Sequence, residues 1–375
     1  MREVKEILEK VAAFAPGERA ILATVVDVQG SGYRLPGARM LTLENGDTFG
    51  MVSGGCLEAD VLERAKKVLT SGRAEVFTYD TTNDESSVFS LNMGCRGVVR
   101  ILLEPVGGGN FLLTNLRGVH EDRETRTIAT LISADGGFEA ELGGRLFYEG
   151  NGSFAADKLP LSLQNLQTLH DACVSFHESE KDYGFQNFET DEGLFEFAFE
   201  SMKPPVALLL FGAGADAIPL ARIASDLGWH IEVFDHRPAF LTKERFPEAD
   251  RLIFHNEENP IGPIKNDPLT VAVIMTHNYE HDSRILPQLL RSNVAYIAAL
   301  GPKRRTEQLL TAAAAGGQSF TQEQRERLYA PAGLDIGADT PEAIALSIAA
   351  EIQSILKDRE GGHLRDRKGS IYDRK

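Results

Sequence analysis

The stretch VALLLFGAGADAIPL, residues 206–220, decides the fold of the C-terminal part of the chain. An uninterrupted apolar strand runs into a glycine-rich turn of the form G-x-G-x-x-A, made by Gly212, Gly214 and Ala217. In dinucleotide-binding folds the first glycine permits a tight turn, the second lets backbone approach a pyrophosphate, and the third small residue keeps the helix near the strand. The pattern therefore predicts a Rossmann-like domain, with the helix N-terminus facing a phosphate.

The ligand of this loop has two candidate classes. Asp235 ends the next predicted strand, HIEVFD, near the offset expected for an acid that binds a ribose diol. It favours NAD over NADP, although His236 and Arg237 weaken that inference. Equally, another phosphate-bearing ligand could use the same cradle, including the backbone of Ala213. The sequence leaves both ligands open.

Strands alternating with helices continue to the end of the domain. The segments DRLIF, TVAVIMT and VAYIAAL are further predicted strands, and TPEAIALSIAAEIQSIL is a helix with Thr340 as its N-cap. Such alternation is typical of a doubly wound parallel sheet. The predicted Rossmann-like domain spans residues 201–357, begins at the MKPP boundary, and is followed by a mobile basic tail at 358–375.

A smaller mixed α/β domain is predicted for residues 1–105. It contains the β-rich segment RAILATVVDV, a hairpin turning at Asn45-Gly46, and a helix opening at Cys56. Residues 106–200 contain another predicted hairpin, TIATLISADGGFEAELGGRLFYEG, but no chemical motif. They are either extra strands of the first domain or a linker with a small sheet of its own.

Composition excludes several classes of function. A formal net charge of −16 over 375 residues argues against a broad nucleic-acid-binding face. No apolar run approaches the roughly 20 residues that span a bilayer, and the first helix is charged, so no membrane role is expected. The three cysteines are too scattered for a disulfide framework. We therefore expect a cytoplasmic protein with free thiols.

Two further loops are predicted at the ligand-binding edge of the sheet. His277 follows the strand TVAVIMT, where it could bind a ligand or simply cap the strand end. With His281 and Asp282 it could also ligate a metal. Two histidines and one aspartate are few ligands for a stable site, so no permanent metal is expected. The other loop has a turn at Gly301, followed by the cations Lys303, Arg304 and Arg305. These cations either bind a phosphate or form a solvated helix face.

Two cysteines have surroundings that suit chemistry. Cys56 is predicted at a helix N-terminus, which stabilises a thiolate, and Gly54 and Gly55 leave room for another molecule. Cys95 lies between glycines in NMGCRGVV, beside Arg96. A buried structural cysteine is the alternative at both positions, and Cys173 has no comparable surroundings.

Several motifs together resemble the XdhC/CoxI family, whose members are accessory proteins that mature molybdenum hydroxylases such as xanthine dehydrogenase. The matching segments lie in both predicted domains and are GSGYRLPGARM, GMVSGGCLEADV, YDTT, GCRGVVRILLEP, FGAGADAIPLARIASDLGWHIEVFDHRPAF, MTHNYEHD, YIAALGPKRR and APAGLDIGADTPEAIALSIAAEI. Residues 106–200 carry no part of the resemblance, and GSGY departs from the small residues or proline expected there.

The resemblance implies a two-domain protein, usually a dimer, that binds molybdenum cofactor. It implies protection of the cofactor while a terminal oxo ligand is exchanged for sulfur from a cysteine desulfurase, followed by delivery to the apo-hydroxylase. Cys56 matches the family's GGC cysteine and Cys95 its GCxG cysteine, so both are the expected catalytic thiols, facing a cleft between the domains. Arg34 and Gly37 lie in the matching R-x-P-G loop, and Lys303–Arg305 would hold the cofactor's phosphate together with the glycine loop.

Three functions are compatible with these sequence features. A cofactor-binding maturation chaperone with little turnover of its own is favoured by the resemblance. An NAD-dependent oxidoreductase, with His277 as acid or base, would use the glycine loop conventionally. A partner that merely docks on the hydroxylase would not need the glycine and cysteine motifs.

Overall fold

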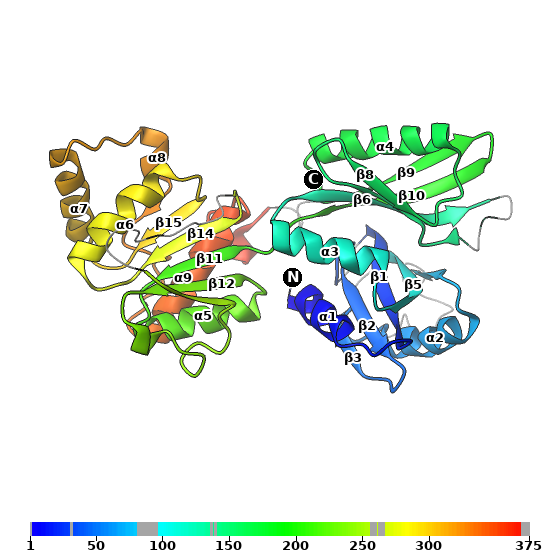
Figure 1. The fold of residues 1–375 in the computed structure, drawn as a ribbon, viewed down its shortest axis with the longest axis horizontal. Helices are drawn as coiled ribbons and strands as arrows, with labels where there is room; N and C mark the ends of the chain where they lie inside the picture. The colour runs from blue at the N-terminus through cyan, green and yellow to red at the C-terminus, as the bar shows by residue number, and fades with distance from the viewer. Residues whose placement is uncertain are drawn as a thin grey trace. The chain divides into compact units, whose positions relative to one another are not determined.

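The computed structural model describes residues 2–30, 33–80, 97–135, 138, 141–255, 261 and 267–368. They belong to two compact units, Glu3–Pro204 and Pro205–Arg374, each with its own sheets and helices (Figure 1). The stretch 106–200, left open by the sequence, belongs to the first unit. Within the described residues, no helix is both long and apolar enough to cross a membrane.

The second unit contains a six-stranded parallel sheet in the order β13-β12-β11-β14-β15-β16. This is the strand order of a Rossmann fold, in which successive strands are added to one side of the first strand and then, from the fourth strand on, to its other side. The sequence prediction of a doubly wound sheet is therefore confirmed. In chain order the elements are β11 (Ala207–Phe211), α5 (Ala217–Asp226), β12 (His230–Asp235), η2 (Pro238–Phe240), β13 (Arg251–Phe254), β14 (Thr270–Ile274), α6 (Tyr279–Arg291), β15 (Tyr296–Ala299), α7 (Lys303–Ala315), α8 (Gln322–Glu326), β16 (Leu328–Tyr329), α9 (Pro341–Leu356) and η3 (Leu364–Asp366).

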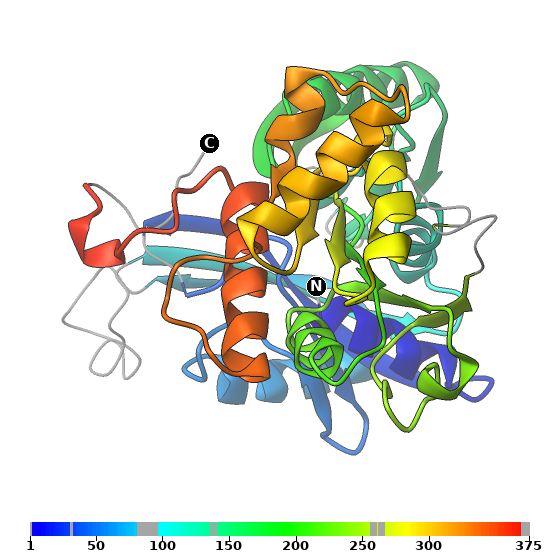
Figure 2. The same cartoon turned by 90° about the vertical axis from the view of Figure 1, so that its left-hand side faces the viewer.

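Helices cover both faces of this sheet. Along β11, Leu208 and Leu210 pack with α5 and α9, whereas Leu209 and Phe211 pack with α6 and α7. The alternation follows from the two-residue period of a strand, and it requires every residue of β11 to be apolar. Figure 2 shows the orange-red α9 and the yellow α6 on opposite sides of the sheet.

The first unit contains two five-stranded antiparallel sheets with one repeated topology. Their orders are β3-β2-β1-β5-β4 and β8-β7-β6-β10-β9, and in each a helix connects the third strand to the fourth. The first half contains α1 (Arg2–Ala12), β1 (Arg19–Gly30), β2 (Arg39–Leu43), β3 (Thr48–Gly50), α2 (Glu58–Ser71), β4 (Glu75–Asp80) and β5 (Gly97–Gly107). After α3 (Phe111–Asp122), the second half contains β6 (Arg126–Ala134), β7 (Arg145–Tyr148), β8 (Phe154–Asp157), α4 (Leu163–Glu178), β9 (Tyr183–Thr190) and β10 (Gly193–Met202).

The repeat extends to single residues. LATVV in β1 corresponds to IATLI in β6, and each strand has a register shift at the same place, at Val26 and at Ile132. Thr24 is paired with Arg39, as Thr130 is with Arg145. Residues 106–200 thus form a second copy of the fold of the first half.

The two sheets pack against each other through a partly charged interface. Arg39 of β2 pairs with Glu200 of β10, with Nη2 2.6 Å from Oε2. In the reciprocal position Arg145 of β7 pairs with Glu104 of β5, with Nη1 2.8 Å from Oε2. Reciprocal contacts of this kind are the mark of an interface between two like surfaces.

The outer face of each sheet is covered by its own helix. Val61 and Ala65 of α2 pack on the first sheet, and Leu169 and Cys173 of α4 pack on the second. The first unit therefore has four layers, helix, sheet, sheet and helix, because both faces of each sheet must be covered.

Candidate functional site

The glycine loop follows β11 at the carboxyl end of the parallel sheet. It lies where the strand order reverses between β11 and β14, which is where open α/β sheets bind ligands. Gly212 has a φ of +114°, and a Cβ atom there would lie 2.4 Å from the backbone oxygen of Met275. Glycine is therefore required at this position by the contact between neighbouring strand ends, whatever the ligand.

The second glycine makes room for a side chain of the protein itself. A Cβ atom on Gly214 would lie 2.6 Å from Oδ1 of Asp216. In a dinucleotide-binding loop this space lets the backbone approach a pyrophosphate. Here the carboxylate of Asp216, the N-cap residue of α5, lies against the glycine and makes no capping hydrogen bond.

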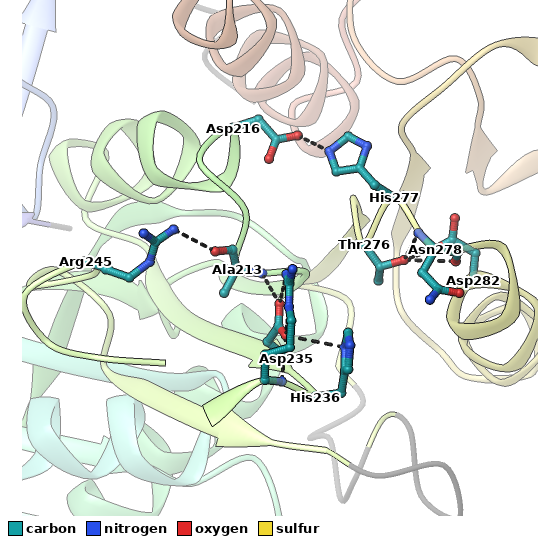
Figure 3. A network of polar contacts seen from close by, with 10 residues as sticks. Ala213, Asp216, Asp235, His236, Arg245, Thr276, His277, Asn278 and Asp282 are labelled. Carbon is teal, nitrogen blue, oxygen red and sulfur yellow. Dashed lines mark hydrogen bonds and ion pairs between the residues drawn. The ribbon is translucent and has the colours of Figure 1, made fainter. Parts of the chain in front are cut away.

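Asp216 is held instead by the next loop of the same edge. His277, which follows β14, places Nε2 2.6 Å from Oδ2 of Asp216 (Figure 3). The Asp216 side chain is 17% exposed and that of His277 is 63% exposed, so the imidazole is open to solvent and the carboxylate is partly buried. His277 has a φ of +56°, a conformation uncommon outside glycine. The two loops are thus linked across the switch point by a carboxylate–imidazole pair.

The acid predicted to bind a ribose points back into the protein. Asp235 is 1% exposed and accepts hydrogen bonds from the amide of Ala213 at 2.7 Å and from the amide and guanidinium of Arg237 at 2.8–3.0 Å. The carbonyl of Ala213 accepts a hydrogen bond from Arg245 (Figure 3). Both Asp235 and Ala213 are therefore occupied by the protein's own groups, and of the two ligands left open by the sequence, NAD is not supported.

These hydrogen bonds make Asp235 a stabilising group with a defined pH dependence. Burial alone would raise its pKa, but the hydrogen bonds from Arg237 and the Ala213 amide lower the pKa to about 2. Because a carboxyl group in an unfolded chain titrates near pH ~3.9, the stabilisation is full above that pH and is lost as the pH falls towards about 2.

Asp235→Asn is expected to lower the free energy of unfolding of the Rossmann-like unit by about 2 kcal/mol at pH 7 and to flatten its dependence on acid pH. The single tryptophan, Trp229, is buried in this unit, so its fluorescence during urea unfolding reports the unit directly. Equal slopes of stability against pH for the variant and the parent, between pH 5 and 3, would contradict this account.

Three histidines that the sequence reasoning did not group lie together at the same edge. The rings of His236 and His281 stack with centroids 4.1 Å apart, and His255 lies 6.2 Å and 5.8 Å from them. Burial and the neighbouring His281 lower the pKa of His236. Among the described residues, no three histidine, cysteine or acidic side chains are placed to hold a metal ion. Each of these histidines comes shortly after a predicted strand, and this position in the sequence could have indicated that they meet at one edge of the sheet.

The three predicted cations have different environments. Arg305 donates to Asp282 at 2.8 Å and is thereby partly neutralised. Lys303 and Arg304 are exposed in the first turn of α7, just after Gly301, whose φ is +120°. Asp282, in the first turn of α6, is therefore paired with Arg305 and is not placed to share a metal with His277.

The thiol of Cys56 is exposed, in the loop before α2. The helix begins at Glu58, two residues later than predicted, so Cys56 is not in its first turn. The hydroxyl of Ser53 accepts from the Leu57 amide at 3.1 Å, and the carboxylate of Glu58 accepts from the Ser53 amide at 2.8 Å. The loop is therefore closed by its own hydrogen bonds, and a carboxylate lies near the helix start.

Tyr33 and the glycines complete this loop. The ring of Tyr33, 64% exposed, lies 3.1 Å from where a Cβ of Gly54 would be, so Gly54 accommodates the ring. Gly55 has open space around its Cα and a φ of +103°. Cys56 is thus beside an exposed aromatic ring rather than within a packed core.

The other predicted residues of the first unit have structural partners. Arg34 pairs with Glu3 of α1. A Cβ on Gly37 would lie 2.9 Å from Oε1 of Glu200, so this glycine admits the Arg39–Glu200 pair. Cys173 is fully buried, and burial raises the pKa of its thiol to about 12. Cys95 and the adjacent Arg96 lie outside the described residues.

Comparison with known families agrees with these features. Residues 13–80 match the model described as the XdhC and CoxI family, and residues 208–352 match the XdhC Rossmann domain. The chain is similar to a protein of Bacillus subtilis that is named as a probable subunit of xanthine dehydrogenase, with 32% identity over 339 residues that cover 89% of this chain and 92% of the relative.

Two more similar proteins span nearly the whole chain. The molybdenum cofactor insertion chaperone PaoD of Escherichia coli is 23% identical over 350 residues, which cover 93% of this chain and 87% of PaoD. A crystal structure described as a xanthine dehydrogenase from Bacillus halodurans has a TM-score of 0.74 and 28% identity, and the match covers 96% of this chain and 97% of that one. The similarity therefore includes both units.

Proposed function

This chain belongs to the XdhC and CoxI family, and we propose that it binds molybdenum cofactor, supports its sulfuration and delivers it to a molybdenum hydroxylase of the xanthine dehydrogenase type. The observation that carries the proposal is the match to a cofactor insertion chaperone over 93% of the chain. A protein of this kind binds and releases its ligand without necessarily turning it over.

The described residues offer groups that fit such a cofactor. When bound, the cofactor supplies a molybdenum–dithiolene centre whose oxo ligand can be exchanged for sulfur. The exposed thiol of Cys56 is a soft ligand suited to a molybdenum–sulfur environment. The exposed cations Lys303 and Arg304 suit a terminal phosphate, and Asp216 offers acceptors for donor groups of a pterin.

Cys56 is the residue that we assign to hold sulfur during sulfuration. Its thiolate would attack the outer sulfur of a cysteine desulfurase persulfide, forming a new S–S bond as the bond within the donor breaks. The donor leaves as a thiolate, so atoms and electrons balance without another oxidant. Exposure beside Gly55, where there is open space, supports access for a donor of protein size.

The test is to purify the protein anaerobically from cells that make molybdenum cofactor and to assay molybdenum and oxidised pterin fluorescence together. We expect near-stoichiometric amounts of both, with most of the cofactor lost in Cys56→Ala. Cys173→Ala is the matched control, because that thiol is fully buried and should not affect cofactor content in folded protein. An absence of pterin, or recovery of a nicotinamide nucleotide in its place, would contradict the proposal.

The partners follow from the same assignment. We propose an apo-hydroxylase as recipient, a cysteine desulfurase as sulfur donor, and a homodimer as the assembly. Light scattering tests the dimer. Activation of purified apo-hydroxylase by loaded protein, measured with Cys56→Ala alongside, tests delivery separately from binding.

A further inference from the structure

The geometry points to a subsite at Asp216 and His277 that binds the aminopyrimidinone edge of a pterin, in the place where a Rossmann fold usually binds phosphate. This inference rests on the proposed function and adds to it which end of the ligand meets the glycine loop. It reverses the expectation, drawn from the sequence, that the loop holds the phosphate.

The glycine loop is unsuited to an anion. The carboxylate of Asp216 already lies against Gly214, in the space that a pyrophosphate would approach. The Ala213 amide is directed to Asp235 at 2.7 Å, and the Ala217 amide bonds the Gly214 carbonyl at 3.3 Å. A phosphate would therefore meet a like charge and find two of the loop's amides occupied.

Asp216 is suited to a ligand that donates hydrogen bonds. Within the described residues its one hydrogen bond is to His277, through Oδ2, which leaves the lone pairs of Oδ1 and one of Oδ2. A pterin presents two parallel N–H donors, at its 2-amino group and at N3, which match the two oxygens of a carboxylate. Such hydrogen bonds to a charged acceptor are stronger than those between neutral groups.

His277 acts as a positioning residue for this carboxylate. It comes from the loop after β14, whereas Asp216 precedes α5, so the imidazole fixes the carboxylate from the opposite side of the switch point (Figure 3). Gly214 has no side chain, which leaves the carboxylate close to the loop backbone. The pair therefore presents a fixed acceptor at the edge where this fold binds ligands.

The strand order also indicates where the phosphate end of the ligand would bind. The strands β11, β14 and β15 are neighbours, and Lys303 and Arg304 follow β15 at the same edge. Asp216 and these cations therefore follow strands of one sheet edge, and a ligand whose pterin ring meets Asp216 would direct its phosphate along that edge towards them.

The test uses two pteridines that lack molybdenum and phosphate, and a phosphate compound that lacks a pteridine. We would titrate the full-length protein with 6-hydroxymethylpterin, with the corresponding lumazine, in which an oxo group replaces the 2-amino group, and with inorganic pyrophosphate. The parent protein is expected to bind the pterin at least about tenfold more tightly than the lumazine, because the lumazine lacks one donor. Pyrophosphate should not displace the pterin.

Variants assign the discrimination to the named residues. Asp216→Asn is expected to abolish the preference for pterin over lumazine, and His277→Gln to reduce it. The matched control is Asp226→Asn at the far end of α5, where the side chain is 66% exposed and the preference should be unchanged.

The outcomes separate this inference from the proposed function. Equal binding of pterin and lumazine, no binding of pterin, displacement by pyrophosphate, or full discrimination in Asp216→Asn would each overturn the subsite. If molybdenum cofactor still copurifies with the protein in any of these cases, the chaperone function stands and only its assignment to this loop fails.

Discussion

Glu104→Gln is expected to lower the free energy of unfolding of the first unit by about 3–5 kcal/mol. The side chains of Glu104 and Arg145 are 7% and 5% exposed and form their ion pair between the two sheets. Removing the carboxylate leaves the guanidinium buried without its counter-charge, and it is this desolvated charge, rather than the lost attraction, that makes the variant unstable. The readout is calorimetry combined with hydrogen exchange of β5 and β7.

The repeat supplies the control for this substitution. Glu200→Gln removes the reciprocal partner, but the side chain of Glu200 is 23% exposed against 7% for Glu104. Water can therefore compensate Arg39 in part, and a distinctly smaller loss is expected. Equal losses in both variants would mean that burial does not determine the strength of these pairs.

Gly212→Ala is the second substitution with a large expected effect, about 3 kcal/mol or more on the Rossmann-like unit. Its cause is backbone geometry: the φ of +114° is strained for alanine, and the new Cβ would lie 2.4 Å from the Met275 carbonyl oxygen. Urea unfolding followed by Trp229 fluorescence measures this loss of stability in the Rossmann-like unit.

Gly214→Ala separates folding from binding within the same motif. Its Cβ would meet only the carboxylate of Asp216, a side chain that can turn away. We expect a loss of less than about 1 kcal/mol in stability but a loss of pterin discrimination, because Asp216 is displaced. If Gly214→Ala unfolded the unit as readily as Gly212→Ala, the two glycines would share one structural role.

The architecture of the second unit could be predicted because local patterns determine it. The apolar strand before Gly212 and the alternation of strands and helices indicate a parallel sheet, and Thr340 accepts from the Ala343 amide, as expected of an N-cap. Which partner a polar side chain takes is not a local property. Asp235 stands at the position of a ribose-binding acid, yet Arg237 and Ala213 occupy it.

The repeat in the first unit was missed for a related reason. It is carried by strand order, by a register shift and by a few residues such as Thr24 and Thr130, while most side chains differ. The burial of Glu104 and Arg145 is not visible in the local sequence, because it depends on contact between two sheets that lie far apart along the chain. The start of α2 was placed two residues early because Ser53 and Glu58 close the loop before it.

The repeated topology gives the first unit the arrangement of a dimer within one chain. Each half covers the charged sheet face of its copy, so neither half is expected to persist as a folded monomer if separated. Because both copies belong to one chain, their side chains can differ. One has the exposed thiol of Cys56 just before the N-cap of α2, where the other has Leu161 before the N-cap Ser162 of α4. A dimer of identical chains cannot have such a difference between its halves. Within one chain, one half can carry the reactive thiol while the other half has a structural role only.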